Sequence, residues 1–174
     1  PNAKDQLKSL LGVAAGLLWI YTDFGRLVAF DLSTGELVHR LSSNPYDSTN
    51  PCYTMVESLG VCFFREEDKA IVSINSLGVR IFDAATAACL ESYRFADVDP
   101  DGIPAFKYFA IAQFQGDYFT FRAERDGASC GWRWAGVFDL KARRLLWAGE
   151  VISSQERERT GNQLVASRPL YYAG

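Results

Sequence analysis

The sequence predicts an all-β domain made of repeated antiparallel meanders. The main observation is a phrase that occurs three times: an apolar run ending in Phe-Asp, a short polar turn and a second apolar run. The copies place their phenylalanines at Phe30, Phe82 and Phe138, so they lie 52 and 56 residues apart. Units repeated at such a spacing bury each other's faces. A second observation is the alternation of apolar and polar residues, rich in aromatic and β-branched types, which favours strands.

Composition limits the classes of protein to consider. The chain has 174 residues, of which 48% are hydrophobic, so we expect one domain over residues 1–174 with a full core. A net charge of −3 argues against a nucleic-acid-binding surface, which normally has a basic excess. No run reaches the roughly 18 apolar residues that cross a bilayer, so we expect no membrane partner.

The cysteines and the N-terminal segment favour a cytoplasmic protein. Residues 9–21 are apolar and follow Lys4 and Lys8, as in a secretion signal, but they run straight into the first repeat, so cleavage would remove a strand. Pro1 is consistent with removal of an initiator methionine, and a start chosen within a longer chain would look the same. The cysteines at positions 52, 62, 89 and 130 form no Cys-x-x-Cys pair, and there is one histidine. We therefore expect reduced thiols and no zinc site.

The first unit is predicted to begin with a short N-terminal helix. Asn2 would cap a helix over residues 3–11, and Gly12 would end it. Strands are expected at 17–22, 26–32 and 36–41, with turns at 23–25 and 33–35. Gly35 is expected to supply a positive φ in the second turn. Residues 42–53 contain two Asn-Pro pairs and are predicted to be irregular.

The second and third units each show four predicted strands. The expected strands are 56–64, 70–75, 78–83, 88–95, 106–114, 117–124, 132–140 and 144–152. A charged linker at 153–161 precedes one last predicted strand at 163–172. Because the first unit has only three predicted strands, this last strand would supply the missing one and close a ring by pairing the two ends of the chain.

Residues 23–38 resemble a blade of the PQQ-like and WD-like β-propeller repeats. The shared features are a Gly turn, an apolar strand, Asp31, a Thr-Gly pair that ends at Gly35, and a further strand. A tryptophan near the end of the last strand, Trp147, is matched in the third unit. The resemblance implies a small propeller-like domain of three to four degenerate blades without a catalytic residue in its motif. A twisted β-sandwich of the same meanders is the other architecture. Gly35 has no glycine counterpart in the second and third copies.

Two motifs match catalytic sequence patterns but lack the structural context that catalysis needs. Ser129 lies in a G-x-S-x-G pattern, but a nucleophile elbow needs a following helix and a later histidine, whereas the single histidine, His39, lies upstream. Asp23-Phe-Gly25 matches a kinase magnesium motif without the rest of a kinase and is predicted to be a hairpin turn. We expect His39 to be a packed or edge histidine, and we expect no catalytic residue and no enzyme activity. A hydrolase using Ser129 or Cys130 is the minor alternative.

An acidic segment is the best candidate for a ligand site. Asp97, Asp99 and Asp101 alternate and precede Gly102, as in the first half of a calcium loop. The twelfth position is Tyr108, where such a loop needs a bidentate Glu, so an acidic solvated loop is the simpler interpretation. We therefore predict no metal and no cofactor.

These observations favour a non-enzymatic protein-binding module. The leading hypothesis is a cytosolic bacterial inhibitor or immunity protein that neutralises a toxin or enzyme. Its acidic loops would face a basic partner and speed association. The predicted partner-binding residues are Glu66, Glu67, Asp68, Asp97, Asp99 and Asp101. The alternatives are a ligand- or calcium-binding propeller-type sensor domain, and loops that only maintain solubility.

Overall fold

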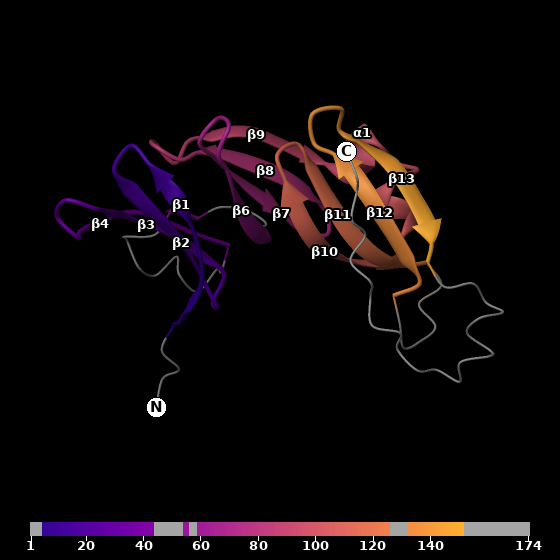
Figure 1. The fold of residues 1–174 in the computed structure, drawn as a ribbon, viewed down its shortest axis with the longest axis horizontal. Helices are drawn as coiled ribbons and strands as arrows, with labels where there is room; N and C mark the ends of the chain where they lie inside the picture. Colours follow the sequence, from indigo (N-terminus) through magenta and orange to yellow (C-terminus); the bar gives the residue numbers. More distant parts are fainter. Residues whose placement is uncertain (1–4, 44–53, 56–58, 126–131, 152–174) are drawn as a thin grey trace.

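The computed structural model describes residues 5–43, 54–55, 59–125 and 132–151, and these form three β-sheets (Figure 1). The first sheet contains β1 (Leu7–Ala14), β2 (Leu17–Thr22), β3 (Arg26–Asp31), β4 (Leu37–Ser42) and β5 (Thr54–Met55). The second contains β6 (Val61–Arg65), β7 (Ala70–Ile74), β8 (Gly78–Asp83) and β9 (Cys89–Arg94). The third contains β10 (Tyr108–Gln115), β11 (Tyr118–Glu124), β12 (Trp134–Asp139) and β13 (Arg144–Glu150). The all-β prediction is confirmed.

Each sheet is built on a four-stranded antiparallel meander, as the repeat predicts. Neighbouring strands pair in chain order, and β5 alone joins β4 in parallel. The predicted bounds of β2 and β8 match the structure, and most other strands differ by one or two residues at an end. The predicted strand at 56–64 is seen from Val61 onward. The loop at 44–53, the linker at 153–161 and the predicted strand at 163–172 lie outside the described residues.

The prediction of an N-terminal helix is wrong for the described part of that segment. Leu7–Ala14 is strand β1, which pairs antiparallel with β2. The register shifts twice, between Leu7 and Ser9 and between Leu10 and Gly12. Leu7 and Leu10, which the helix prediction placed on an apolar face, are 58% and 62% exposed on this strand. A helix this short is marginal by itself, whereas pairing with β2 gives the segment backbone hydrogen bonds along one of its edges. The fourth strand of the first sheet is therefore β1.

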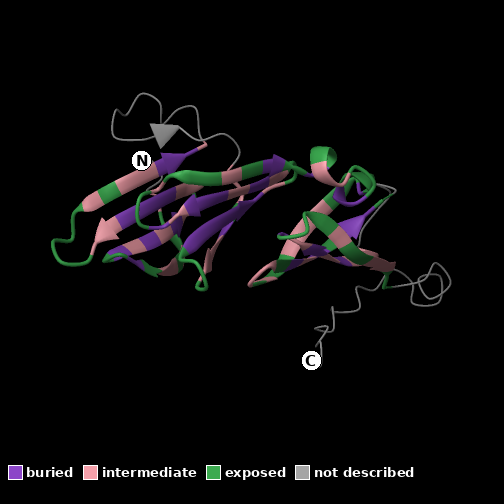
Figure 2. Ribbon diagram, turned by 90° about the horizontal axis from the view of Figure 1, so that it is seen from above, coloured by how far each residue is buried: buried purple, intermediate pink, exposed green. Residues whose placement is uncertain are grey.

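The second sheet is covered on both faces, and this explains its composition. All five residues of β7 are buried. Val72 belongs to a core shared with Phe119 and Phe121 of the third sheet. Ile71, on the other face, belongs to a core shared with Trp19 of the first sheet. Because successive strand residues point to opposite faces, β7 has to be apolar at nearly every position. Buried residues accordingly extend through the middle of the molecule in Figure 2.

The first strands of the three meanders lie near one another. Among strands of different sheets, the most extensive backbone contacts join β6 to β1 and β6 to β10. A buried hydrogen bond also joins the first two sheets, since Trp19 Nε1 donates to the carbonyl oxygen of Ala84 at 2.7 Å. The order of the sheets in space therefore follows their order in the chain.

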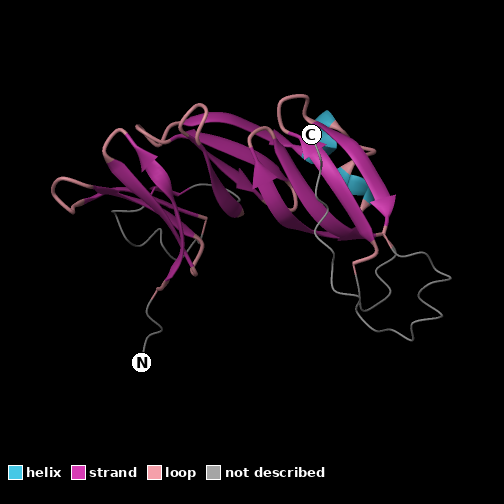
Figure 3. Ribbon diagram, in the orientation of Figure 1, coloured by secondary structure: helices cyan, strands magenta, loops and turns pink. Residues whose placement is uncertain are grey.

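A link of 13 residues between the second and third sheets packs into the core. It contains helix α1 (Phe95–Val98) and a 3₁₀ turn (Ile103–Ala105), shown in cyan in Figure 3. The rings of Phe95 and Phe138 meet edge to face with centroids 5.2 Å apart, and Phe106 packs similarly on Phe121 at 5.7 Å. The acidic loop predicted at residues 97–101 therefore lies within a link whose aromatic residues enter the core. Across the described part of the chain, no helix has the length and apolar character needed to cross a membrane.

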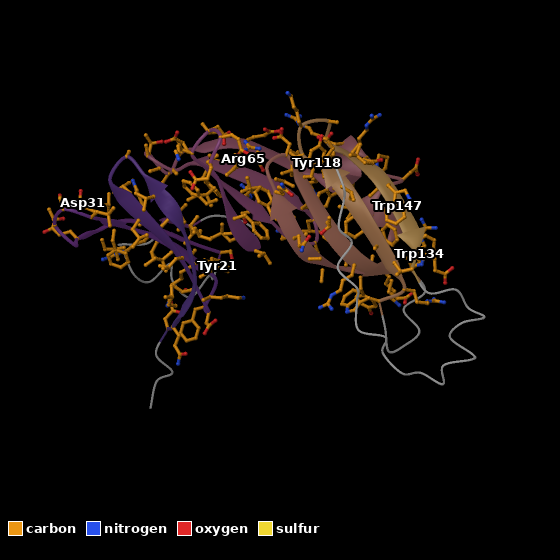
Figure 4. The ribbon with its side chains drawn as sticks, viewed as in Figure 1. Tyr21, Asp31, Arg65, Tyr118, Trp134 and Trp147 are labelled. Atoms are coloured by element: carbon orange, nitrogen blue, oxygen red, sulfur yellow. The ribbon has the colours of Figure 1, made fainter. Side chains whose placement is uncertain are left out.

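The aspartate of each repeat holds the turn that follows it. Asp31 Oδ1 accepts hydrogen bonds from the backbone amides of Ser33 and Thr34, at 2.8 and 3.0 Å. Asp83 and Asp139 make the corresponding contacts at Ala85 and Thr86 and at Ala142. A carboxylate in this position satisfies amides that the tight turn leaves without backbone partners. Asp31 can be found at the edge of the first sheet in Figure 4.

The three turns also share a residue with positive φ, as predicted for Gly35. The φ angles are +73° at Gly35, +60° at Ala87 and +55° at Arg143. The last two residues adopt the left-handed conformation although a Cβ atom makes it unfavourable. A register shift follows in all three hairpins. The backbone of the repeat is thus preserved where its glycine is not.

We predict that Ala87→Gly stabilises the protein by about 0.5–1 kcal/mol, because relief of left-handed strain exceeds the added entropy of the unfolded chain. Ala85→Gly is the matched control in the same turn, since Ala85 does not have a positive φ. The control should destabilise the protein slightly. Urea unfolding measures the free energy of unfolding of both variants. Equal values for Ala87→Gly and Ala85→Gly would show that the backbone at Ala87 is not strained.

The same turns predict sensitivity to acid. The hydroxyl of Ser33 holds the pKa of Asp31 below its usual 3.8, and the hydroxyl of Thr86 does the same for the pKa of Asp83. A lowered folded-state pKa contributes stability that is complete above the unfolded value and is lost as the pH falls through the folded value. Stability should therefore fall below about pH 4. Asp83→Asn should show a shallower fall in urea midpoint than the native protein, and Thr86→Val an intermediate one. If the urea midpoint of Asp83→Asn fell with pH as steeply as that of the native protein, the Asp83 carboxylate would not be the source of the acid sensitivity.

Candidate functional site

Two of the three predicted acids in the β6–β7 turn are engaged in ion pairs. Arg65 Nη2 lies 2.6 Å from Asp68 Oδ2, and Lys69 pairs with Glu66. The hydrogen bond from Arg65 lowers the pKa of Asp68. Glu67 is exposed and makes no ion pair with any described residue. Of this predicted set, Glu67 is therefore the carboxylate that remains available to a partner.

Arg65 fixes this turn against the third sheet. Its second terminal nitrogen, Nη1, lies 3.4 Å from Asp117 in the β10–β11 turn. Gly116 in that turn has a φ of +57°, and a Cβ atom there would lie 3.5 Å from Glu67 Oε1. Figure 4 shows Arg65 and Tyr118 at the same upper edge of the molecule. The sequence does not single out Arg65, because its two acidic partners lie 3 and 52 residues away.

In the second predicted acidic set, two aspartates are exposed to solvent and the third makes a structural hydrogen bond. Asp97 and Asp101 are exposed, as expected. Asp99 is partly buried, and its Oδ2 accepts a hydrogen bond of 2.6 Å from the backbone amide of Leu145 on β13. A Cβ atom on Gly102 would lie 2.4 Å from this oxygen, so the glycine allows the carboxylate to reach β13. Asp99 thus anchors the link between the sheets.

The two acidic segments do not form one patch. The β6–β7 turn lies where Arg65 pairs with Ala70, whereas α1 leaves β9 where Gly78 pairs with Arg94. These are opposite ends of the second sheet. In the described part of the chain, no three His, Cys, Asp or Glu residues lie close enough together to hold a metal ion. The three aspartates at 97–101 therefore do not converge as calcium ligands.

The remaining candidate residues have structural surroundings where the structure describes them. His39 stacks on Trp19 with ring centroids 5.7 Å apart, which confirms the prediction of a packed histidine. Cys62 and Cys89 are free thiols, and burial raises the pKa of Cys62 to about 12. Asp23-Phe-Gly25 forms the predicted hairpin turn, in which Gly25 has a φ of +71°. Ser129, Cys130 and Cys52 lie outside the described residues.

A cluster of arginines on aromatic rings was not predicted. Arg125 lies over the rings of Trp134 and Phe106, with its guanidinium carbon 4.2 and 4.9 Å from the ring centroids. Arg122 lies over Trp132 at 5.0 Å. The sequence signal for this cluster is the pair of tryptophans at 132 and 134 in the strand predicted at 132–140, because alternate residues of a strand lie on one face. In the structure only Trp134 belongs to β12, and cations cover both rings.

We predict that Asp99→Ala costs about 1–2 kcal/mol of unfolding free energy, because the amide of Leu145 loses its charged acceptor. Asp97→Ala, in the same acidic segment but exposed, should change stability by less than about 0.5 kcal/mol. Urea unfolding with and without calcium measures both. Equal effects of the two substitutions, or a calcium-dependent difference between them, would contradict the anchoring role.

Comparison with known proteins does not supply a function for this chain. No protein-family model matches it, and no curated protein matches it significantly.

Proposed function

We propose that the chain is a non-enzymatic protein-binding module in which the three sheets are consecutive blades of a small propeller-type domain. Its class would be that of cytoplasmic inhibitors or immunity proteins, which bind and neutralise a toxin or enzyme. The observation that carries the proposal is the β6–β7 turn. Arg65 holds this turn in place through ion pairs with Asp68 and Asp117, while the carboxylate of Glu67 is exposed and forms no ion pair with a described residue.

The sheet arrangement supports blades rather than a two-layer sandwich. In a sandwich each sheet has one buried face. Here each face of the second sheet packs on a different neighbouring sheet. The first strand of each meander lies nearest the next sheet, as in a radial array. Propeller-type repeats of this kind carry their variable contacts in the turns between strands.

The fixed turn supports binding to a protein. A surface group that is already held in its bound geometry loses little entropy on association, so more of the interaction energy appears as affinity. An exposed carboxylate also attracts a basic partner over a distance set by the salt concentration. Arg65 fixes the turn that carries Glu67, and the Glu67 carboxylate is exposed, whereas Glu66 and Asp68 already have cationic partners.

The test is affinity capture from the native host with the tagged full chain, read by mass spectrometry, with and without calcium. We expect one stoichiometric partner that does not depend on calcium. Glu67→Lys should weaken binding of that partner by about tenfold or more, mainly through slower association. Glu36→Lys is the matched control, because it reverses an exposed acid in the β3–β4 turn of another sheet.

Either of two results would contradict this proposal. Equal affinities of Glu67→Lys and Glu36→Lys would show that the β6–β7 turn is not the contact. Absence of a protein partner, together with a calcium-dependent rise in melting temperature, would favour a ligand- or calcium-binding sensor, because a ligand of the native state stabilises it.

A further inference from the structure

A hollow of about 380 Å³ lies where the second sheet passes into the third. Its walls come from the β7–β8 turn, the end of β9, and the segment that leads into β10. Small-molecule sites in proteins are concave, mostly apolar, and have volumes of about 300–1,000 Å³. The hollow lies at the opposite end of the second sheet from Glu67, since Gly78 pairs with Arg94 there.

Aromatic rings make up much of the wall. Phe106, Phe109 and Trp132 line the hollow, and Phe106 is held by the ring of Phe121 behind it. Two further lining residues, Leu77 and Tyr108, are each 53% exposed. Large apolar side chains that are both exposed and grouped around a concavity mark a surface suited to an apolar ligand.

The charged groups at the hollow are all cationic. Arg94 and Lys107 line it, and neither forms an ion pair with a described residue. Among the lining residues that the structure describes, none is an aspartate or glutamate. Glu124, at the end of β11, is buried and paired with Arg133 at 2.9 Å. Lys107 lies over the ring of Tyr108 at 5.7 Å, and since no described carboxylate pairs with Arg94 or Lys107, both positive charges remain available to an anion.

We propose that this hollow binds small organic anions that carry an aromatic ring. Arg94 and Lys107 would hold the anionic group through charge-assisted hydrogen bonds. Leu77, Tyr108 and Phe109, which line the hollow, would pack on the aromatic part. Carboxylates, sulfonates and phosphates share the anionic chemistry. This site is independent of the partner-binding turn proposed above.

The direct test uses the full chain and the dye 8-anilinonaphthalene-1-sulfonate, an aromatic anion whose fluorescence rises in apolar surroundings. We expect saturable binding at one site. The double variant Arg94→Gln/Lys107→Gln should bind the dye about tenfold more weakly, since charge-assisted hydrogen bonds are lost. The uncharged analogue N-phenyl-1-naphthylamine should bind the native protein more weakly and should not respond to the double variant.

The matched control is Lys141→Gln/Arg144→Gln, which removes the same charge around the β12–β13 turn, outside the lining of the hollow. It should bind the dye as the native protein does. Competition then separates the two parts of the site: benzoate and phenyl phosphate should displace the dye, and inorganic phosphate should not. Circular dichroism melting confirms that each variant folds.

Three results would overturn the proposal. The first is undiminished dye binding by the Arg94→Gln/Lys107→Gln variant, or equal weakening in the control. The second is binding of the uncharged analogue as tightly as the anion. The third is displacement by inorganic phosphate as effective as displacement by phenyl phosphate.

Discussion

Burial of both faces of the second sheet is the constraint on which the rest of the structure depends. A sheet that packs on one neighbour can keep a polar face, but β7 has no polar face, and even Ser73 is buried. A buried hydroxyl needs a hydrogen-bond partner, and Ser73 Oγ accepts a hydrogen bond from the backbone amide of Gly60 at 2.9 Å. Exposure of either face would place a row of apolar side chains in water. The outer sheets are therefore part of the folding unit rather than additions to it.

Repetition of one turn makes this stacking possible. Each meander has to return its last strand to the sheet without disturbing the face that packs on the next sheet. The aspartate that closes the turn and the residue of positive φ do this in the same way at Asp31, Asp83 and Asp139. The second and third copies keep the backbone geometry with Ala87 and Arg143 in place of glycine. Arg143 also pairs with Glu91 at 2.6 Å, which gives that position a role outside the turn.

Connections between the sheets separate the two proposed binding surfaces. At one end of the second sheet, Arg65 joins the β6–β7 turn to the β10–β11 turn and leaves Glu67 exposed. At the other end, the link that carries Phe95 and Phe106 enters the core and leaves the cationic aromatic hollow beside it. The surfaces differ in charge and in shape, so a basic protein and a small aromatic anion would not compete for the same residues.

The sequence by itself determined the strands, the repeat and the turns, because those depend on alternation and turn chemistry within a few residues. The bounds of β2 and β8 and the left-handed Gly35 are examples. It misassigned β1 because the spacing of its leucines suggested a helix, whereas its pairing with β2 is set by a partner strand that the leucine spacing does not reveal. From the sequence, Asp99 and Glu67 were both predicted to bind a partner. Tertiary structure gave Asp99 a structural contact instead, with Leu145, which lies 46 residues away along the chain. It also fixed the turn of Glu67 through the contact of Arg65 with Asp117, which spans 52 residues. Such contacts arise only when separate sheets pack together, and no local pattern encodes them.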